Sequence, residues 1–173
     1  MAQIIWQRAL IEDSWQLFEQ GSTAPLPAGG DVIVPLDAWL LARETFVARS
    51  GRVGVWLNPD ADPAALAPDL SRVSLIAIRF PHFSDGRGYT LARLLRERYG
   101  YRGELRAIGD VTRDQLFYLS RCGFDAFALR ADQNSVDALA ALDDFSEAYQ
   151  ASVERPVPLF RRRALRAGLS ETP

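Results

Sequence analysis

The densest group of reactive side chains lies in one ten-residue segment, residues 79–88, with the sequence RFPHFSDGRG. Guanidinium groups bind sulfate, phosphate or carboxylate through paired N–H donors, and a glycine-containing loop before a helix presents backbone N–H groups to the same ligands. The only histidine of the chain, His82, exchanges a proton near neutral pH. The segment therefore predicts an anion site with binding residues Arg79, Ser84, Gly86, Arg87 and Gly88 and catalytic residues His82 and Asp85.

The same segment also fits a purely structural role. In that interpretation Ser84 or Asp85 caps the following helix, the two glycines form the turn, and Arg87 is solvated. Asp-Gly-Arg-Gly is not a known phosphate-binding motif, so the residues alone leave both interpretations open.

A further candidate catalytic residue is Asp110, which follows the predicted strand at 105–108. One carboxylate makes a poor metal site, so we predict no bound metal and expect Asp110 either to orient a substrate or to bind local backbone or an arginine. Thr112 and Gln115 have the spacing of a capping box. Arg93 and Arg96 are expected on a solvated helix face.

Missing residue types exclude several kinds of chemistry. All 20 basic residues are arginine, which excludes Schiff-base catalysis and the lysine of a phosphate-binding loop. One cysteine, Cys122, and one histidine exclude an intrachain disulfide, a zinc finger and an iron–sulfur cluster held by this chain alone. The chain has no Gly-x-Gly-x-x-Gly turn, so any cofactor stays unknown. We expect Cys122 to be a buried apolar residue.

The elements that position these residues alternate between short apolar strands and helices. Five β-α units follow Asp31, with strands at 32–34, 53–57, 73–79, 105–108 and 124–129. The helices are predicted at 36–50, 63–70, 89–99, 112–122 and 135–151. Such strands are typical of a parallel sheet covered on both faces, so the fold class is α/β. The residues after each strand then lie at one edge, where ligands bind.

Two architectures fit this pattern: a partial TIM-barrel-like arc, which we favour, and an open doubly wound sheet. Residues 1–30 are expected to form an N-terminal hairpin and linker, with strands at 4–11 and 15–18 and a turn at 12–14. Residues 31–151 form the α/β domain. Residues 152–173 are an arginine-rich tail that docks on an acidic partner, crosses a homodimer or is a frayed end.

Net charge and hydropathy limit the kinds of partner that the chain is expected to have. The net charge of −2 gives no general field for nucleic acid or an anionic membrane, so neither is an expected partner. No run approaches 18 apolar residues, and the first residues lack the charged and apolar regions of a signal peptide. We therefore expect a cytoplasmic protein.

Several motifs between residues 30 and 150 are similar to those of one bacterial family. They are VPLxxW at 34–39, FPxFxDGRGY at 80–89, LLR at 94–96, GELRAxGDV at 103–111, DQL at 114–116 and RCGFD at 121–125. The family resembled is one of unknown function, whose members often carry the label "oxidoreductase probably involved in sulfite reduction". Its genes typically neighbour those for assimilatory sulfite reductase and phosphosulfate reductase.

The resemblance implies a role in sulfite reduction without assigning a catalytic residue. In one interpretation the chain is an oxidoreductase or redox component whose loop at 79–88 binds sulfite, sulfate or phosphate. In the other it is a non-catalytic accessory that binds or assembles sulfite reductase through the arginine-rich tail or the N-terminal hairpin. An unrelated small-molecule activity is a third possibility. The candidate site residues within the motifs are Arg79, Asp85, Arg87, Asp110 and Asp125.

Overall fold

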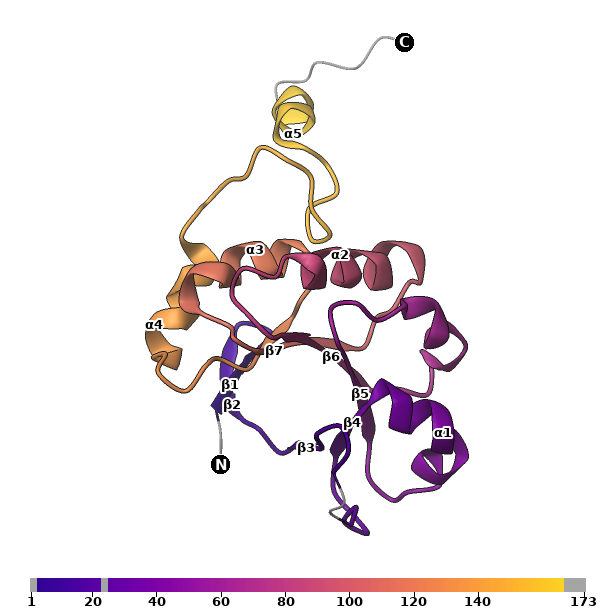
Figure 1. Ribbon diagram of the computed structural model, residues 1–173. Coiled ribbons are helices and arrows are strands. Elements are labelled where there is room, and N and C mark those ends of the chain that lie inside the picture. Colours follow the sequence, from indigo (N-terminus) through magenta and orange to yellow (C-terminus); the bar gives the residue numbers. More distant parts are fainter. Residues whose placement is uncertain (1–2, 23–24, 167–173) are drawn as a thin grey trace.

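The computed structural model describes residues 3–22 and 25–166, and within them eight strands form a single sheet. The strands are β1 (Gln3–Trp6), β2 (Ala9–Glu12), β3 (Gln16–Leu17), β4 (Val32–Pro35), β5 (Val53–Leu57), β6 (Leu75–Phe80), β7 (Glu104–Gly109) and β8 (Ala126–Phe127). The α-helices are α1 (Leu36–Val47), α2 (Arg87–Arg93), α3 (Leu116–Arg121), α4 (Ser135–Ala140) and α5 (Leu159–Arg166). The sheet curls into a half-barrel with α1 to α4 around its outer face (Figure 1).

The strand order is β2-β1-β8-β7-β6-β5-β4-β3. From β3 to β8 every strand pairs in parallel with its neighbour in the chain, so this part of the sheet is wound in one direction. A doubly wound sheet needs a reversal of strand order, which these described strands do not have. The α/β class is confirmed, and the sheet forms an arc. It is mixed rather than parallel, however, because β1 pairs antiparallel with both β2 and β8.

The predicted helix at 63–70 is replaced by two short turns. Shorter helical turns in the described chain cover Pro63–Ala65, Ala67–Asp69, Leu94–Arg98, Arg113–Gln115 and Ala141–Asp143, of which the third is π-helical and the others are 3-10. Pro63 and Pro68 lack the N–H donors that a continuous helix needs, so the segment between β5 and β6 forms two turns instead. None of the described helices is long and apolar enough to span a bilayer.

The helix predicted at 135–151 also ends early, at Ala140, followed by one 3-10 turn. Asp143 ends that turn and Asp144 follows it, and negative charge is unfavourable at the carboxyl end of a helix. Both carboxylates bind arginines from other elements instead: Asp143 pairs with Arg8, and Asp144 pairs with Arg113 at 3.0 Å. Residues 144–158 consequently form a loop without regular structure, which returns to the end of α3, where the Val153 N–H donates to the carbonyl oxygen of Arg121 at 3.1 Å, before it leads to α5 (Figure 1).

The N-terminal hairpin is present, but its turn and second strand differ from the prediction. β1 and β2 are joined at Gln7 and Arg8, which both have positive φ, as in the two-residue turns that suit twisted strands. The predicted turn at 12–14 instead begins a crossing to the opposite edge of the sheet, where β3 pairs with β4. The prediction was wrong because Gln-Arg lacks the Asn-Gly or Asp-Gly signature of such turns.

The half-barrel has an outer core beneath the helices and a packed inner face. The inner face carries the apolar side chains of Ile33, Trp56, Leu75, Ala77 and Ile108. Residues 13–15 connect β2 at one edge of the sheet to β3 at the other, and Trp15 packs against this inner cluster. These side chains therefore pack the inner face of the half-barrel.

A buried ion-pair network anchors this crossing segment. The Arg106 side chain is only 2% exposed and donates from Nη1 to both oxygens of Asp13, at 3.0 and 2.9 Å. Its Nε donates to Glu104 at 2.7 Å. Burial raises the pKa of Glu104, and the charge of Arg106 opposes that rise. Because a buried charge is tolerated only when it is paired, the three residues hold the N-terminal segment inside the arc.

Arg96 is buried, so its expected place on a solvated helix face was wrong. Its guanidinium donates to the carbonyl oxygens of Gly123, Tyr101 and Gly103 at 2.9, 2.9 and 2.8 Å. It also pairs with Asp125 at 3.1 Å, and Asp125 in turn accepts the backbone N–H of Leu105 at 2.7 Å. Asp125, a candidate site residue in the sequence, thus joins the π-helical turn to the starts of β7 and β8.

Candidate functional site

The predicted anion-binding residues run from the end of β6 through the loop into the first turn of α2, and two charged side chains of this segment, Asp85 and Arg87, bind each other. Arg87 donates from Nε and Nη2 to the Asp85 carboxylate at 3.0 and 2.7 Å, and its backbone N–H donates to the same group at 3.1 Å. The side-chain hydrogen bond from Arg87 lowers the pKa of Asp85 to about 2. Asp85 therefore stays ionised near neutral pH and caps the first amide of α2, the structural role that the sequence left open.

The two glycines of this loop have different surroundings. A Cβ on Gly88 would lie 2.7 Å from Cζ of Phe80, so this glycine lets the first turn of α2 pack directly on β6. Gly86 is exposed, and the nearest atom to a Cβ there is 4.0 Å away. Ser84 is exposed as well. Of the predicted binding residues, Ser84, Gly86 and Arg87 are thus exposed, and of these Arg87 is already paired with Asp85.

Arg79 lies on the inner face of the half-barrel, because side chains alternate along β6. Its guanidinium stacks 4.2 Å above the ring of Trp56, and its Nη2 donates to both oxygens of Glu19, at 2.7 and 2.6 Å. The charge that was predicted to hold an anion is therefore paired with a carboxylate of the same chain. No local pattern in the sequence marks Glu19, which reaches this point because the N-terminal segment crosses the sheet.

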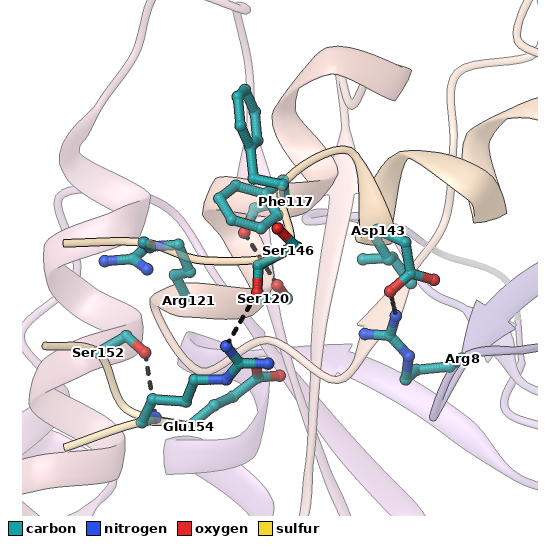
Figure 2. Close-up of a pocket in the computed structure, with 12 residues that line it drawn as sticks. Arg8, Phe117, Ser120, Arg121, Asp143, Ser146, Ser152 and Glu154 are labelled. Carbon is teal, nitrogen blue, oxygen red and sulfur yellow. Dashed lines mark hydrogen bonds and ion pairs between the residues drawn. The ribbon is translucent and has the colours of Figure 1, made fainter. Parts of the chain in front are cut away.

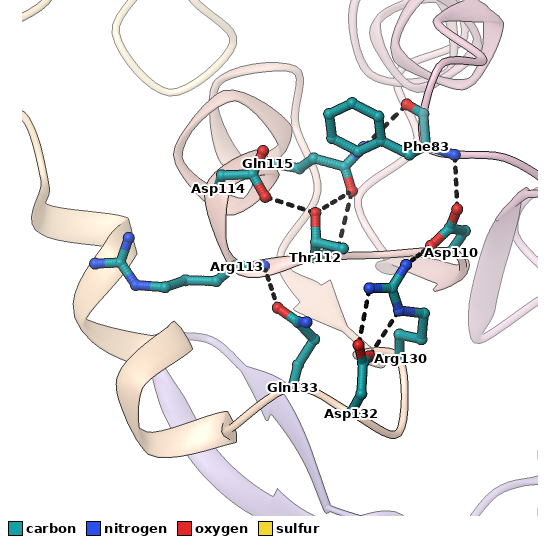
Figure 3. A network of polar contacts seen from close by, with 9 residues as sticks. All are labelled: Phe83, Asp110, Thr112, Arg113, Asp114, Gln115, Arg130, Asp132 and Gln133. Atoms are coloured by element: carbon teal, nitrogen blue, oxygen red, sulfur yellow. Dashed lines mark hydrogen bonds and ion pairs between the residues drawn. The ribbon is translucent and has the colours of Figure 1, made fainter.

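Asp110 joins the loops that follow three neighbouring strands (Figure 3). One carboxylate oxygen accepts the backbone N–H of Phe83 at 2.8 Å, and the other accepts Nη1 of Arg130 at 2.7 Å. Arg130 also forms a two-point pair with Asp132, at 2.6 and 2.9 Å. The Phe83 amide and then Arg130 lower the pKa of Asp110, which keeps this carboxylate ionised.

The capping box at Thr112 and Gln115 is confirmed and belongs to the same set of contacts (Figure 3). The Thr112 backbone N–H donates to Oε1 of Gln115 at 2.9 Å. Nε2 of Gln115 donates to the hydroxyl oxygen of Tyr89 at 3.1 Å. The start of the α3 segment and the first turn of α2 are therefore fixed relative to each other, beside the loop that carries Phe83.

The three predicted catalytic residues lie around one loop. His82 is exposed, and its charge contributes to lowering the pKa of both Asp85 and Asp110. The structure thus brings His82 close to two carboxylates, each of which is already held by an arginine. Such an arrangement keeps both carboxylates charged, and His82 is exposed in the same loop as Asp85.

The charge at this carboxyl edge is negative. Arg79, Arg87 and Arg130 are each paired there with a carboxylate, and Asp37 and Asp60 lie near the ends of β4 and β5. A cavity of about 270 Å³ at the ends of β4 and β5 has Asp37 and Asp60 among its lining residues and no arginine. A free anion would therefore meet occupied guanidinium groups and an excess of negative charge.

The described residues offer little for redox or metal chemistry of their own. No three histidine, cysteine, aspartate or glutamate side chains converge within them in a way that would hold a metal ion. Cys122 is buried, as predicted, and burial raises the pKa of its thiol. The thiol is thus protonated at neutral pH and shielded from solvent.

A second surface with unusual composition is the C-terminal arm, which we define as residues 144–166. Its helix α5 has no buried side chain and is attached mainly through the preceding loop, where Arg162 pairs with Glu147 at 2.7 Å. The arm carries the exposed large apolar side chains Phe145, Tyr149, Val157, Phe160 and Leu165. Figure 1 shows α5 standing away from the half-barrel. The rest of the predicted tail, residues 167–173, lies outside the described residues.

Comparison with known families agrees with the motif resemblance. The model of a bacterial protein family of unknown function, DUF934, matches residues 54–160, more than half of the chain. The match begins in β5 and ends in α5, so it includes the loops after β5 to β8 and most of the C-terminal arm. No curated protein matches the chain significantly. The chain therefore belongs to this bacterial family of unknown function, DUF934.

Proposed function

We propose that the chain is a non-catalytic, cytoplasmic accessory protein of sulfite reduction, which docks on an acidic surface of sulfite reductase through its C-terminal arm. The observation that carries the proposal is α5: eight residues, four of them arginine, with no side chain buried. The link to sulfite reduction comes from the motif resemblance.

A helix as short as α5 needs packing against other residues to be stable in water. Isolated helices shorter than about 12–15 residues are marginal in water, and most helices in proteins are stabilised by packing an apolar face. The Leu165 side chain is 71% exposed and that of Phe160 is 53% exposed, so the chain itself supplies little of that packing. A partner that covers these side chains stabilises the helix and gains affinity from their burial.

The composition of the arm indicates what the partner surface is like. Arginine and aromatic residues are enriched at the cores of protein interfaces, and charge complementarity sets partner choice. Arg163 and Arg166 are exposed on α5, beside the exposed ring of Phe160. An acidic patch with an apolar centre is the matching surface.

The test is the affinity of the full chain for sulfite reductase from the source organism, measured by biolayer interferometry. Arg163→Glu combined with Arg166→Glu is expected to weaken binding about ten-fold or more, since each exposed ion pair contributes up to about 1 kcal/mol and reversal adds repulsion. Arg98→Glu, an exposed arginine outside the arm, is the matched control. Equal loss in control and arm variants would contradict docking by the arm. A second copy of the chain could bind the arm instead of sulfite reductase, and light scattering tests this by measuring the mass of the protein in solution.

An oxidoreductase of the same pathway is the second candidate, favoured by the place of His82 and Asp85 in the loop after β6, where the neighbouring Phe83 amide binds Asp110. Such an enzyme must bind a redox group that the chain does not itself supply. Native mass spectrometry of protein purified gently from cells grown on sulfate distinguishes the two. A bare chain or one carrying sulfite reductase subunits supports the accessory role, and an added flavin or nicotinamide mass supports the enzyme.

A further inference from the structure

A cavity lies at the opposite end of the strands from the loops described above. It has a volume of about 290 Å³ and is bounded by α3, the 3-10 turn after α4 and the start of the C-terminal arm (Figure 2). Arg8, in the turn between β1 and β2, marks the end of the sheet: the neighbouring Trp6 pairs with Ala126, where β8 begins. The predicted anion loop is at the other edge, so this cavity is a separate feature.

Two arginines in the lining have N–H donors to spare. Nη2 of Arg121 donates to the carbonyl oxygen of Gln150 at 3.0 Å. Nη1 of Arg155 donates to the carbonyl oxygen of Ser146 at 3.4 Å. The carboxylate nearest Arg155 is Glu147, at 3.6 Å. A guanidinium has five N–H donors, so each of these two arginines keeps most of its donors free to bind a ligand. Among the described residues neither forms a two-point carboxylate pair like that of Arg87 with Asp85 or of Arg130 with Asp132.

The rest of the lining combines hydroxyl groups with an aromatic wall. Ser120, Ser146 and Ser152 line the cavity, and Oγ of Ser152 accepts the backbone N–H of Arg155 at 3.1 Å, which positions that arginine. The ring of Phe117 packs on that of Phe145 with centroids 4.9 Å apart. The cavity is much larger than a bare oxyanion, so it has room for an apolar group beside the charged one.

Negative charge in the lining is limited. Asp143 is paired with Arg8, as Figure 2 shows. Glu154 is exposed at the rim and opposes an anion, so its removal should strengthen binding. The other carboxylate near the two arginines is Glu147, 3.6 Å from Arg155, and it is already paired more closely with Arg162, at 2.7 Å.

We propose that this cavity binds a small phosphate or sulfate ester, with the oxyanion between Arg121 and Arg155 and the apolar part against Phe117. Guanidinium groups recognise such oxyanions by charge-assisted, often two-point hydrogen bonds. Because Arg121 belongs to α3 and Arg155 to the arm, the ligand also connects the arm to the body. The site is independent of the proposed docking, since it uses neither Arg163 nor Arg166.

The experiment is calorimetric titration of the full chain with phenyl phosphate, phenyl sulfate, inorganic phosphate and phenol. One or both esters are expected to bind at least ten-fold more tightly than inorganic phosphate, and phenol is expected not to bind. The comparison of the two esters distinguishes phosphate from sulfate as the preferred group. Absence of binding by both esters at millimolar concentration overturns the proposal.

Variants locate the site. Arg121→Gln and Arg155→Gln should each weaken ester binding at least ten-fold, while Arg98→Gln, outside the cavity, should leave it unchanged. Glu154→Gln lies at an exposed position, keeps the fold, and should tighten binding several-fold. If the Arg98 variant loses as much ester affinity as the cavity variants, or if the Glu154 variant gains none, the assigned cavity is wrong. The Glu154 result decides even if an arginine variant fails to fold.

Discussion

The replacement of Arg96 by methionine gives a quantitative test of the fold. Its guanidinium is 8% exposed and donates to three carbonyl oxygens at 2.8–2.9 Å, as well as to Asp125. Methionine fills a similar volume without donors. Three acceptors lose a partner at about 1 kcal/mol each, and the lost charge-assisted hydrogen bond to Asp125, whose side chain is 33% exposed, adds up to about 2 kcal/mol. We therefore expect the free energy of unfolding to fall by about 3–5 kcal/mol, a large share of a typical domain's stability.

The pH dependence of this loss has a definite sign. Burial raises the pKa of Asp125 in the folded protein, and Arg96 opposes that rise. Without Arg96 the folded-state pKa rises further above the unfolded value, so the folded variant binds the proton more tightly than the unfolded chain. The variant then gains stability as pH falls toward the folded pKa, and the difference from the parent protein narrows between pH 7 and pH 5.

Urea unfolding followed by tryptophan fluorescence measures both quantities. Arg93→Met is the matched control, because Arg93 lies one helical turn earlier, is half exposed, and pairs only with Glu97 at 3.0 Å. The control should change stability by less than about 0.5 kcal/mol. A loss below 1 kcal/mol for Arg96→Met, or a difference that widens as pH falls, would refute the reasoning.

Two further predictions concern the loop after β6. Gly88→Ala should destabilise the protein by about 1–3 kcal/mol in thermal unfolding, because the new Cβ would lie 2.7 Å from Phe80, whereas Gly86→Ala should be neutral; equal effects would contradict the packing role of Gly88. Arg87→Gln should raise the pKa of Asp85 from about 2 toward its ordinary value, as followed by carboxyl carbon chemical shifts in NMR; an unchanged pKa would mean that Arg87 is not its cause.

The sequence predicted what periodicity and caps determine. Apolar runs such as Val53–Leu57 became buried strands, but their alternation with helices fitted both an arc and an open doubly wound sheet, and the strand order decided for the arc. The Thr112 capping box was found because both its partners lie within four residues. The ends of helices near prolines and aspartates were predicted less accurately. The apolar pattern continues past these residues, although their backbone or charge is unfavourable for a helix.

What the sequence could not predict are contacts between distant segments. The pairing of Arg79 with Glu19 joins residues 60 positions apart, and that of Arg106 with Asp13 joins residues 93 apart. Both depend on the N-terminal crossing, for which no local pattern exists. The candidate residues His82, Asp85 and Asp110 were grouped because loops after neighbouring parallel strands meet at one edge, but whether their charges were free or paired was not visible in the sequence.

The most direct test of the docking proposal compares how tightly two chains bind sulfite reductase: the full chain and a chain truncated after Pro156. Truncation removes α5, none of whose side chains is buried, so the melting temperature should change little. The account predicts that the truncated chain keeps its fold and binds at least ten-fold more weakly. Equal affinity of the two chains, or no binding by the full chain, would contradict it.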